Sequence, residues 1–163
     1  MTLFQALLLS AAFLCSLVAG LLFTFAIVVM PGIAKLDDRD FVRAFQVIDR
    51  VIRNQPVFLF VWVGSTLAAT TAAGFGSREV GGTDRVLLQA AAVIHLLGVQ
   101  VPTATINIPL NNLLQKLNPG TMSEADGKRV RREFEPRWNR WNGIRTVCAS
   151  VASVLLLVLI FRL

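Results

Sequence analysis

The chain has 163 residues, of which 55% are hydrophobic and only 16% are charged, and its formal net charge is +6. A water-soluble domain of this size needs more polar surface, so the composition excludes that class. The charges are also segregated, and each charge-free stretch is long enough to cross a hydrocarbon core of about 30 Å as a helix. We therefore predict an all-α fold, an integral membrane four-helix bundle that forms a single transmembrane domain over residues 1–163. The charge-free stretches are 1–34, 54–76, 86–115 and 146–161.

The first predicted membrane helix covers about residues 3–30. We expect it to be retained rather than cleaved as a signal peptide, because no charged segment precedes it and its apolar run exceeds the usual 7–15 residues or so. Pro31 and Gly32 are expected to break the helix at the membrane edge. Apolar residues then recur at helical spacing among charges over residues 35–54, which predicts an amphipathic helix that lies at the interface or packs under the bundle, capped by Asp37 or Asp38.

The second predicted membrane helix covers about residues 56–76, with a proline in its first turn, where proline is tolerated. The third covers about 86–110 and the fourth about 142–161. The polar loop between the last two contains an Asn-Pro-Gly turn signal at 118–120. A basic, partly helical stretch follows this turn, and Pro136 is expected to kink or restart that helix.

Lysine and arginine are distributed unequally between the two faces of the predicted bundle. Twelve lie in the loops before the second and fourth helices, against three on the opposite face, Arg78, Arg85 and Arg162. The positive-inside rule therefore places loops 35–54 and 111–141 in the cytoplasm and both termini outside, which suits a bacterial inner membrane. We attribute the excess of basic residues to membrane topology and to contact with lipids, and we expect no nucleic-acid partner. Cys15 and Cys148 lie in apolar segments and form no disulfide or metal pattern.

The third helix concentrates polar residues that are costly inside a membrane. At about 100° per residue these residues fall within one narrow stripe, whereas His95, the only histidine, lies about 120° away. The stripe is either a polar seam that joins helices or the wall of a pocket. His95 is either a hydrogen-bonded core residue or a proton carrier. The stripe contains Gln89, Gln100, Thr103, Asn107 and Asn111.

A second polar concentration stands at the start of the fourth helix. Trp138, Trp141, Asn142 and Arg145 recur at steps of three and four residues and therefore share a face. One interpretation is an aromatic belt at the membrane interface. The other is an aromatic-walled pocket with Asn107 and Asn111, in which Arg145 binds a phenolate, a carboxylate or a lipid head group. No cluster of metal ligands and no nucleotide-binding motif is present in the sequence, so we expect neither a metal nor another cofactor.

The segment Asn107-Ile-Pro-Leu-Asn111, followed by Trp138-x-x-Trp-Asn142-x-x-Arg145, resembles the anthrone oxygenase-like family of small four-helix membrane proteins. This family is largely described as a domain of unknown function. Gly20, the Met30-Pro31-Gly32 segment and the long polar loop also fit its pattern, so the resemblance covers nearly the whole chain. It implies a four-helix membrane protein, and some fungal members oxidise anthrones to anthraquinones with dioxygen, without a metal or flavin. Its motif residues are Asn107, Asn111, Trp138, Asn142 and Arg145.

Two functions follow from these residues. The first is a cofactor-independent, anthrone oxygenase-like monooxygenase, or a binder of an aromatic or quinone-like small molecule, with a pocket between the third and fourth helices. His95 would assist deprotonation and Arg145 would stabilise the enolate. The alternative is a non-enzymatic bundle that acts as an accessory or assembly subunit or binds lipid. The candidate substrate-binding residues are Gln100, Thr103, Asn107, Asn111, Trp138, Trp141 and Asn142.

Overall fold

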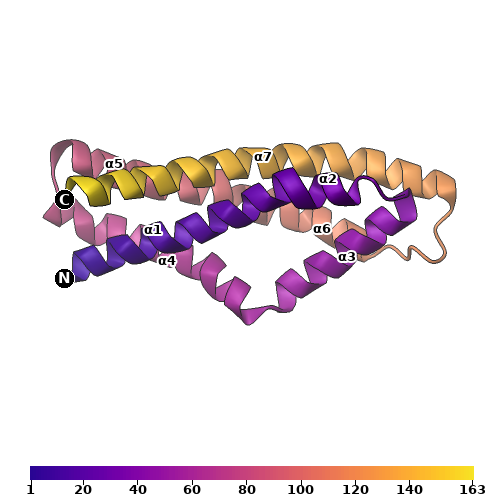
Figure 1. The fold of residues 1–163 in the computed structure, drawn as a ribbon, viewed down its shortest axis with the longest axis horizontal. Coiled ribbons are helices and arrows are strands. Elements are labelled where there is room, and N and C mark those ends of the chain that lie inside the picture. Colours follow the sequence, from indigo (N-terminus) through magenta and orange to yellow (C-terminus); the bar gives the residue numbers. More distant parts are fainter.

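The computed structural model describes residues 1–163 and consists of helices without any strand. Four continuous helical stretches are long and apolar enough to cross a membrane. They run side by side along the long axis with both termini at one end, while α3 and α4 meet in an elbow that projects from one side (Figure 1). This arrangement confirms the predicted all-α membrane bundle with an added amphipathic helix. The elements are α1 (Leu3–Thr24), η1 (Phe25–Val29), α2 (Met30–Ile33), α3 (Asp38–Asn54), α4 (Pro56–Glu79), α5 (Gly82–His95), η2 (Leu96–Gln100), η3 (Thr103–Asn107), α6 (Ile108–Gln115) and α7 (Glu124–Arg162).

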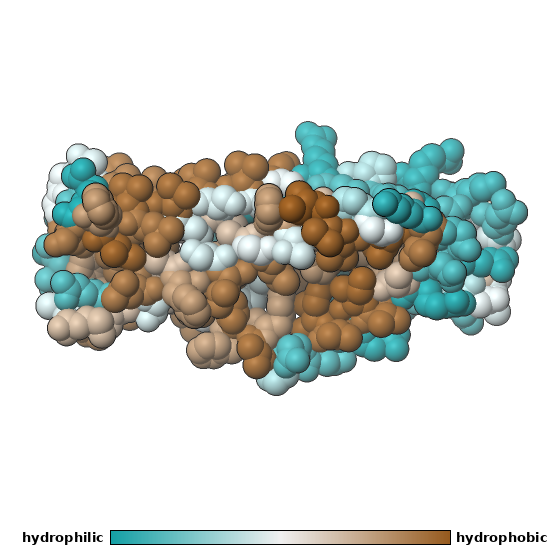
Figure 2. Space-filling model, viewed as in Figure 1, coloured by the Kyte–Doolittle hydropathy of each residue, from teal (hydrophilic) through white to brown (hydrophobic).

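The surface of the bundle divides into an apolar part and a polar end. Hydrophobic residues cover most of its length, and polar residues gather at the end where α3 begins and α7 begins (Figure 2). Large apolar side chains such as Phe13, Phe60 and Val147 are each more than half exposed. Such exposure is unfavourable in water and is expected of helices that contact lipid. The chain is therefore a membrane protein.

Three prolines shape the membrane helices without ending them. Pro31, Pro102 and Pro109 each follow a five-residue π-helical turn by two positions. Proline has no N–H to donate to the carbonyl four residues earlier, and its ring crowds that carbonyl. The turn before it widens, so that the residue preceding the proline donates to the carbonyl five residues back. These wide-turn bonds are Met30 to Phe25, Val101 to Leu96 and Ile108 to Thr103.

The helices consequently extend beyond the boundaries expected from the sequence. The first continues through Pro31 to Ile33 instead of breaking there, and the third covers Gly82–Gln115. The basic stretch before the fourth helix is part of that helix, which runs unbroken from Glu124 through Pro136 to Arg162. Pro136 is exposed outside the apolar region, so water can bind the carbonyl that it leaves free.

Helix α3 is fixed against the polar end of the bundle. The Asp37 side chain caps it by accepting from the Asp40 N–H at 2.9 Å. Arg131 of α7 donates to the carbonyls of Ala34 and Leu36, just before α3. It also pairs with Asp38 and, one turn along α7, with Glu135. The hydrogen bond to Glu135 raises the pKa of the Arg131 guanidinium, which stays charged. This position places one face of α3 over the interior of the bundle.

Candidate functional site

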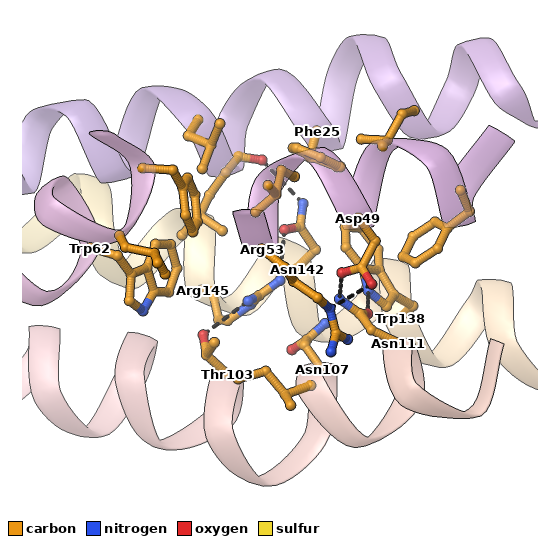
Figure 3. Close-up of a pocket in the computed structure, with 18 residues that line it drawn as sticks. Phe25, Asp49, Arg53, Trp62, Thr103, Asn107, Asn111, Trp138, Asn142 and Arg145 are labelled. Atoms are coloured by element: carbon orange, nitrogen blue, oxygen red, sulfur yellow. Dashed lines mark hydrogen bonds and ion pairs between the residues drawn. The ribbon is translucent and has the colours of Figure 1, made fainter. Parts of the chain in front are cut away.

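A cavity of about 220 Å³ lies inside the bundle, beneath the α3–α4 elbow. Its lining comes from α1 and η1, α3, α4, the η3–α6 segment and α7, so that every membrane helix contributes (Figure 3). Six residues that the sequence singled out lie on its wall, from two helices far apart in the chain. They are Thr103, Asn107 and Asn111 on η3–α6, and Trp138, Asn142 and Arg145 on α7.

Arg145 is a buried cation without a carboxylate partner. It is 4% exposed. Its Nη1 donates to Thr103 Oγ1 at 2.9 Å and its Nη2 donates to Asn142 Oδ1 at 3.0 Å. Its Nε has no partner, and its guanidinium carbon lies 5.8 Å from the centre of the Trp138 ring. An unpaired charge inside a membrane protein is costly and in most cases serves a function. The cavity therefore carries a positive charge that the protein leaves uncompensated.

Asn107 presents further unpaired groups to the same cavity. It is 2% exposed, and neither its Oδ1 nor its Nδ2 has a hydrogen-bond partner. Buried polar atoms are nearly always paired, and exceptions call for an unseen water or ligand. Asn107 ends the wide η3 turn before Pro109, and such turns are frequent at functional sites. With Arg145 Nε, the site holds two free donors and one free acceptor.

A hydrogen-bonded network fixes the other end of the cavity. Asn111 Nδ2 donates to Asp49 Oδ1 at 2.7 Å, and Trp138 Nε1 donates to Asn111 Oδ1 at 2.8 Å. Asp49 Oδ2 accepts from Gln115 at 2.8 Å and from Arg53 Nε at 2.7 Å. Both atoms of the Asn111 amide are therefore committed, and the Trp138 indole is held in one orientation. Asn111 differs in this respect from Asn107, although both lie on one stripe.

Sequence reasoning did not identify Asp49 and Arg53 as lining residues. A usable signal was present, because Asp49 follows Phe41 and Phe45 at four-residue steps and so lies on the apolar face of the amphipathic helix. A carboxylate on that face is buried when the helix packs onto the bundle, and Asp49 is 5% exposed.

Aromatic rings form the cavity walls. Trp138 lies 5.8 Å from Phe25 and 5.6 Å from Phe45, measured between ring centres. On the α4 side, Phe58 and Trp62 stack at 5.5 Å. Rings on both sides suit a flat aromatic molecule, since aromatic pairs prefer stacked or edge-on contact.

Four residues that the sequence singled out lie elsewhere. His95 and Gln100 do not line the cavity: His95 Nε2 lies 3.1 Å from Ser65 Oγ and 3.2 Å from Gln100 Nε2, in a polar seam between α4 and the third helix. Gln89 extends this seam by donating to the Ala73 carbonyl at 2.9 Å. Trp141 is partly exposed and also lies outside the cavity lining. The stripe thus serves both roles considered for it, as a seam up to Gln100 and as a cavity wall from Thr103.

The site offers charge and hydrogen bonds rather than a ligand set for a metal. No group of three His, Cys, Asp or Glu side chains is close enough to hold a metal ion. What the cavity provides is an uncompensated cation, free amide atoms and flat apolar walls. This combination is complementary to an aromatic molecule that carries an oxyanion.

Comparison with known proteins gives one match. The family model described as anthrone oxygenase matches residues 51–155, roughly two thirds of the chain. No curated protein and no solved structure matches the chain. The matched range contains the cavity residues of η3–α6 and α7 together with the seam around His95. The chain therefore belongs to the anthrone oxygenase family, as its motifs indicate.

Proposed function

We propose that the cavity binds a flat aromatic or quinone-like molecule as its oxyanion, a phenolate or enolate, and oxidises it with dioxygen without a cofactor. The observation that carries the proposal is Arg145, which is 4% exposed and has no carboxylate partner, beside an Asn107 amide whose two polar atoms are free. An oxyanion would accept hydrogen bonds from Arg145 Nε and Asn107 Nδ2. A neighbouring hydroxyl of the ligand would donate to Asn107 Oδ1.

In the proposed reaction the ligand itself supplies the electrons. The methylene carbon of an anthrone loses a proton to give an enolate, which Arg145 stabilises by charge. The enolate carbon then bonds to dioxygen, and the resulting hydroperoxide loses water to leave a carbonyl. One oxygen atom of dioxygen enters the product and the other leaves as water, which balances anthrone and dioxygen against anthraquinone and water.

The structure alters the roles first assigned to the catalytic candidates. His95 does not line the cavity, so the proposal gives it no contact with the ligand. Asp49 is the only carboxylate on the wall, but both of its oxygens already accept hydrogen bonds, from Asn111, Gln115 and Arg53, so neither is free to accept a proton from the ligand. We therefore propose that a water molecule that enters the cavity accepts the proton from the methylene carbon of the ligand. The site acts by making the ligand more acidic.

Turnover of anthrone by the protein reconstituted in vesicles tests this function. Dioxygen uptake and anthraquinone formation are followed together, against protein-free vesicles. Removing one donor to a developing oxyanion typically lowers the rate by about a hundredfold or more. Arg145→Gln and Asn107→Leu are expected to show such losses, while Arg140→Gln, an exposed arginine of the same helix, keeps the wild-type rate. Binding without turnover would identify a ligand-binding protein instead, and wild-type rates in both site variants would refute the proposal.

We also propose that the polar end of the bundle, with the α3 and α6–α7 segments, faces the cytoplasm of a bacterium and that both termini face outward. The bias of lysine and arginine toward that end supports this orientation. Single cysteines placed at exposed Arg129 and at Arg78, in a Cys15→Ala, Cys148→Ala background, distinguish the two faces. An impermeant thiol reagent added to whole cells should label position 78 only, and labelling of position 129 alone would reverse the topology.

A further inference from the structure

The exposed side chains of the cavity lining mark where the cavity reaches the surface. Leu59 is 48% exposed and Ile108 is 43% exposed, and Arg53 is also exposed. They belong to the first turn of α4, the start of α6 and the end of α3. The opening therefore lies at the α3–α4 elbow, beside the start of α6.

The surface beside this opening is apolar. Val57, Phe60 and Val63 surround Leu59 on α4 and are 67%, 69% and 53% exposed. Hydrophobic residues cover the α4 arm of the elbow (Figure 2). Because α4 is one of the membrane-spanning helices, this surface contacts acyl chains. Arg53, which binds Asp49 and Asn112, lies on the polar side of the opening.

The polar groups of the cavity are buried, whereas the membrane side of its opening is apolar. Arg145, Asn107 and Thr103 are each at least 91% buried, whereas Leu59 and Ile108 stand at the opening. An engineered cavity of about 150 Å³ accommodates benzene, so about 220 Å³ holds a small fused ring system and little more. A long apolar substituent on a bound ring would have to leave between Leu59 and Ile108.

We propose that the ligand is a lipophilic phenol or quinol dissolved in the bilayer, which enters through this opening. Its oxygen-bearing ring binds at Arg145 and Asn107, and its apolar chain extends between Leu59 and Ile108 into the acyl chains. The inference rests on the ligand binding of the proposed function and not on the oxidation. The proposed substrate class is therefore ring compounds with an apolar chain. Such a chain stays in the lipid, so the cavity has to accommodate only the ring.

Two probes with the same ring test the proposal: naphthol, and naphthol with a decyl chain. Each is titrated into phosphatidylcholine vesicles containing the protein, and binding is followed by tryptophan fluorescence. Affinities are expressed per mole fraction in the membrane, so that partitioning cancels. The wild type is expected to bind both probes within about threefold, because the chain remains in the lipid before and after binding.

Substitutions at the opening supply the decisive comparison. We expect Leu59→Trp and Ile108→Trp each to weaken the binding of decyl-naphthol by about tenfold or more. Both should weaken the binding of naphthol by less than about threefold. Phe60→Trp, on the same surface but outside the lining, is the matched control and should change neither affinity. The inference is overturned if the wild type binds naphthol but rejects its decyl derivative, or if the opening variants affect both probes alike. If the wild type binds neither probe, the proposed function fails with it.

Discussion

The free energy of unfolding of an Asn107 variant distinguishes a ligand site from a structural seam. Its amide is 2% exposed, and neither polar atom has a partner. A buried polar group left unpaired costs about 1–3 kcal/mol. Leucine has the same branched arrangement of side-chain heavy atoms as asparagine and removes both polar groups. Because the substitution removes the cost of burying both groups unpaired, we expect Asn107→Leu to raise the free energy of unfolding by about 1–2 kcal/mol.

Asn142 is the matched control for this prediction. It lies in the same cavity, but its Nδ2 donates to the Leu22 carbonyl at 3.1 Å and its Oδ1 accepts from Arg145. Asn142→Leu leaves Arg145 Nη2 unpaired and removes one of the hydrogen bonds to the Leu22 carbonyl, so it should lower the free energy of unfolding by about 1–3 kcal/mol. Reversible unfolding of the ligand-free protein in mixed detergent micelles measures both changes. If Asn107→Leu destabilises the bundle as much as Asn142→Leu does, the Asn107 amide is paired within the protein and the reasoning is wrong.

Three further changes test the packing around the site. Gly98→Ala would place a Cβ 2.6 Å from Cys148 Sγ, so the free energy of unfolding should fall by about 1–3 kcal/mol in the same assay. The control Gly74→Ala meets no atom within 4 Å, and its free energy of unfolding should stay within about 1 kcal/mol of the wild type. Asp49→Asn removes the charge that holds α3 against α6, so trypsin should cleave within α3 faster than in the wild type, and an unchanged cleavage rate would contradict the network described for it. Arg131→Lys cannot reproduce the several donors that Arg131 directs at the start of α3, so the melting temperature should fall, and a lysine variant as stable as the wild type would show that charge alone suffices.

The sequence predicts the membrane architecture because the bilayer imposes a simple rule on it. Stretches without charge must be helical to satisfy their backbone groups, and there are four of them. The proline positions were harder to interpret. Pro31 cannot donate the α-helical hydrogen bond, and a helix can end at such a position. In the structure, a widened turn before Pro31 instead lets the helix continue.

The same widened turns limit what residue spacing can predict about the site. An angle of about 100° per residue holds for an α-helix, but η2 and η3 both interrupt the third helix between His95 and Asn111. His95 and Gln100 are five residues apart and would diverge in an α-helix, yet their Nε2 atoms lie 3.2 Å apart in the structure. The pairing of residues across the helices was equally out of reach, because Asp49 meets Asn111 only through the packing of α3.

Ionisation of bound anthrone in the absence of dioxygen tests the central claim most directly. The enolate absorbs at longer wavelength than the neutral molecule, so a pH titration in vesicles reports the ionisation without turnover. If the uncompensated charge of Arg145 faces the ligand, bound anthrone should ionise at a pH about 1–3 units lower than in protein-free vesicles, and Arg145→Gln should abolish the difference. If wild-type protein, Arg145→Gln protein and protein-free vesicles all give the same titration, the cavity does not stabilise an oxyanion.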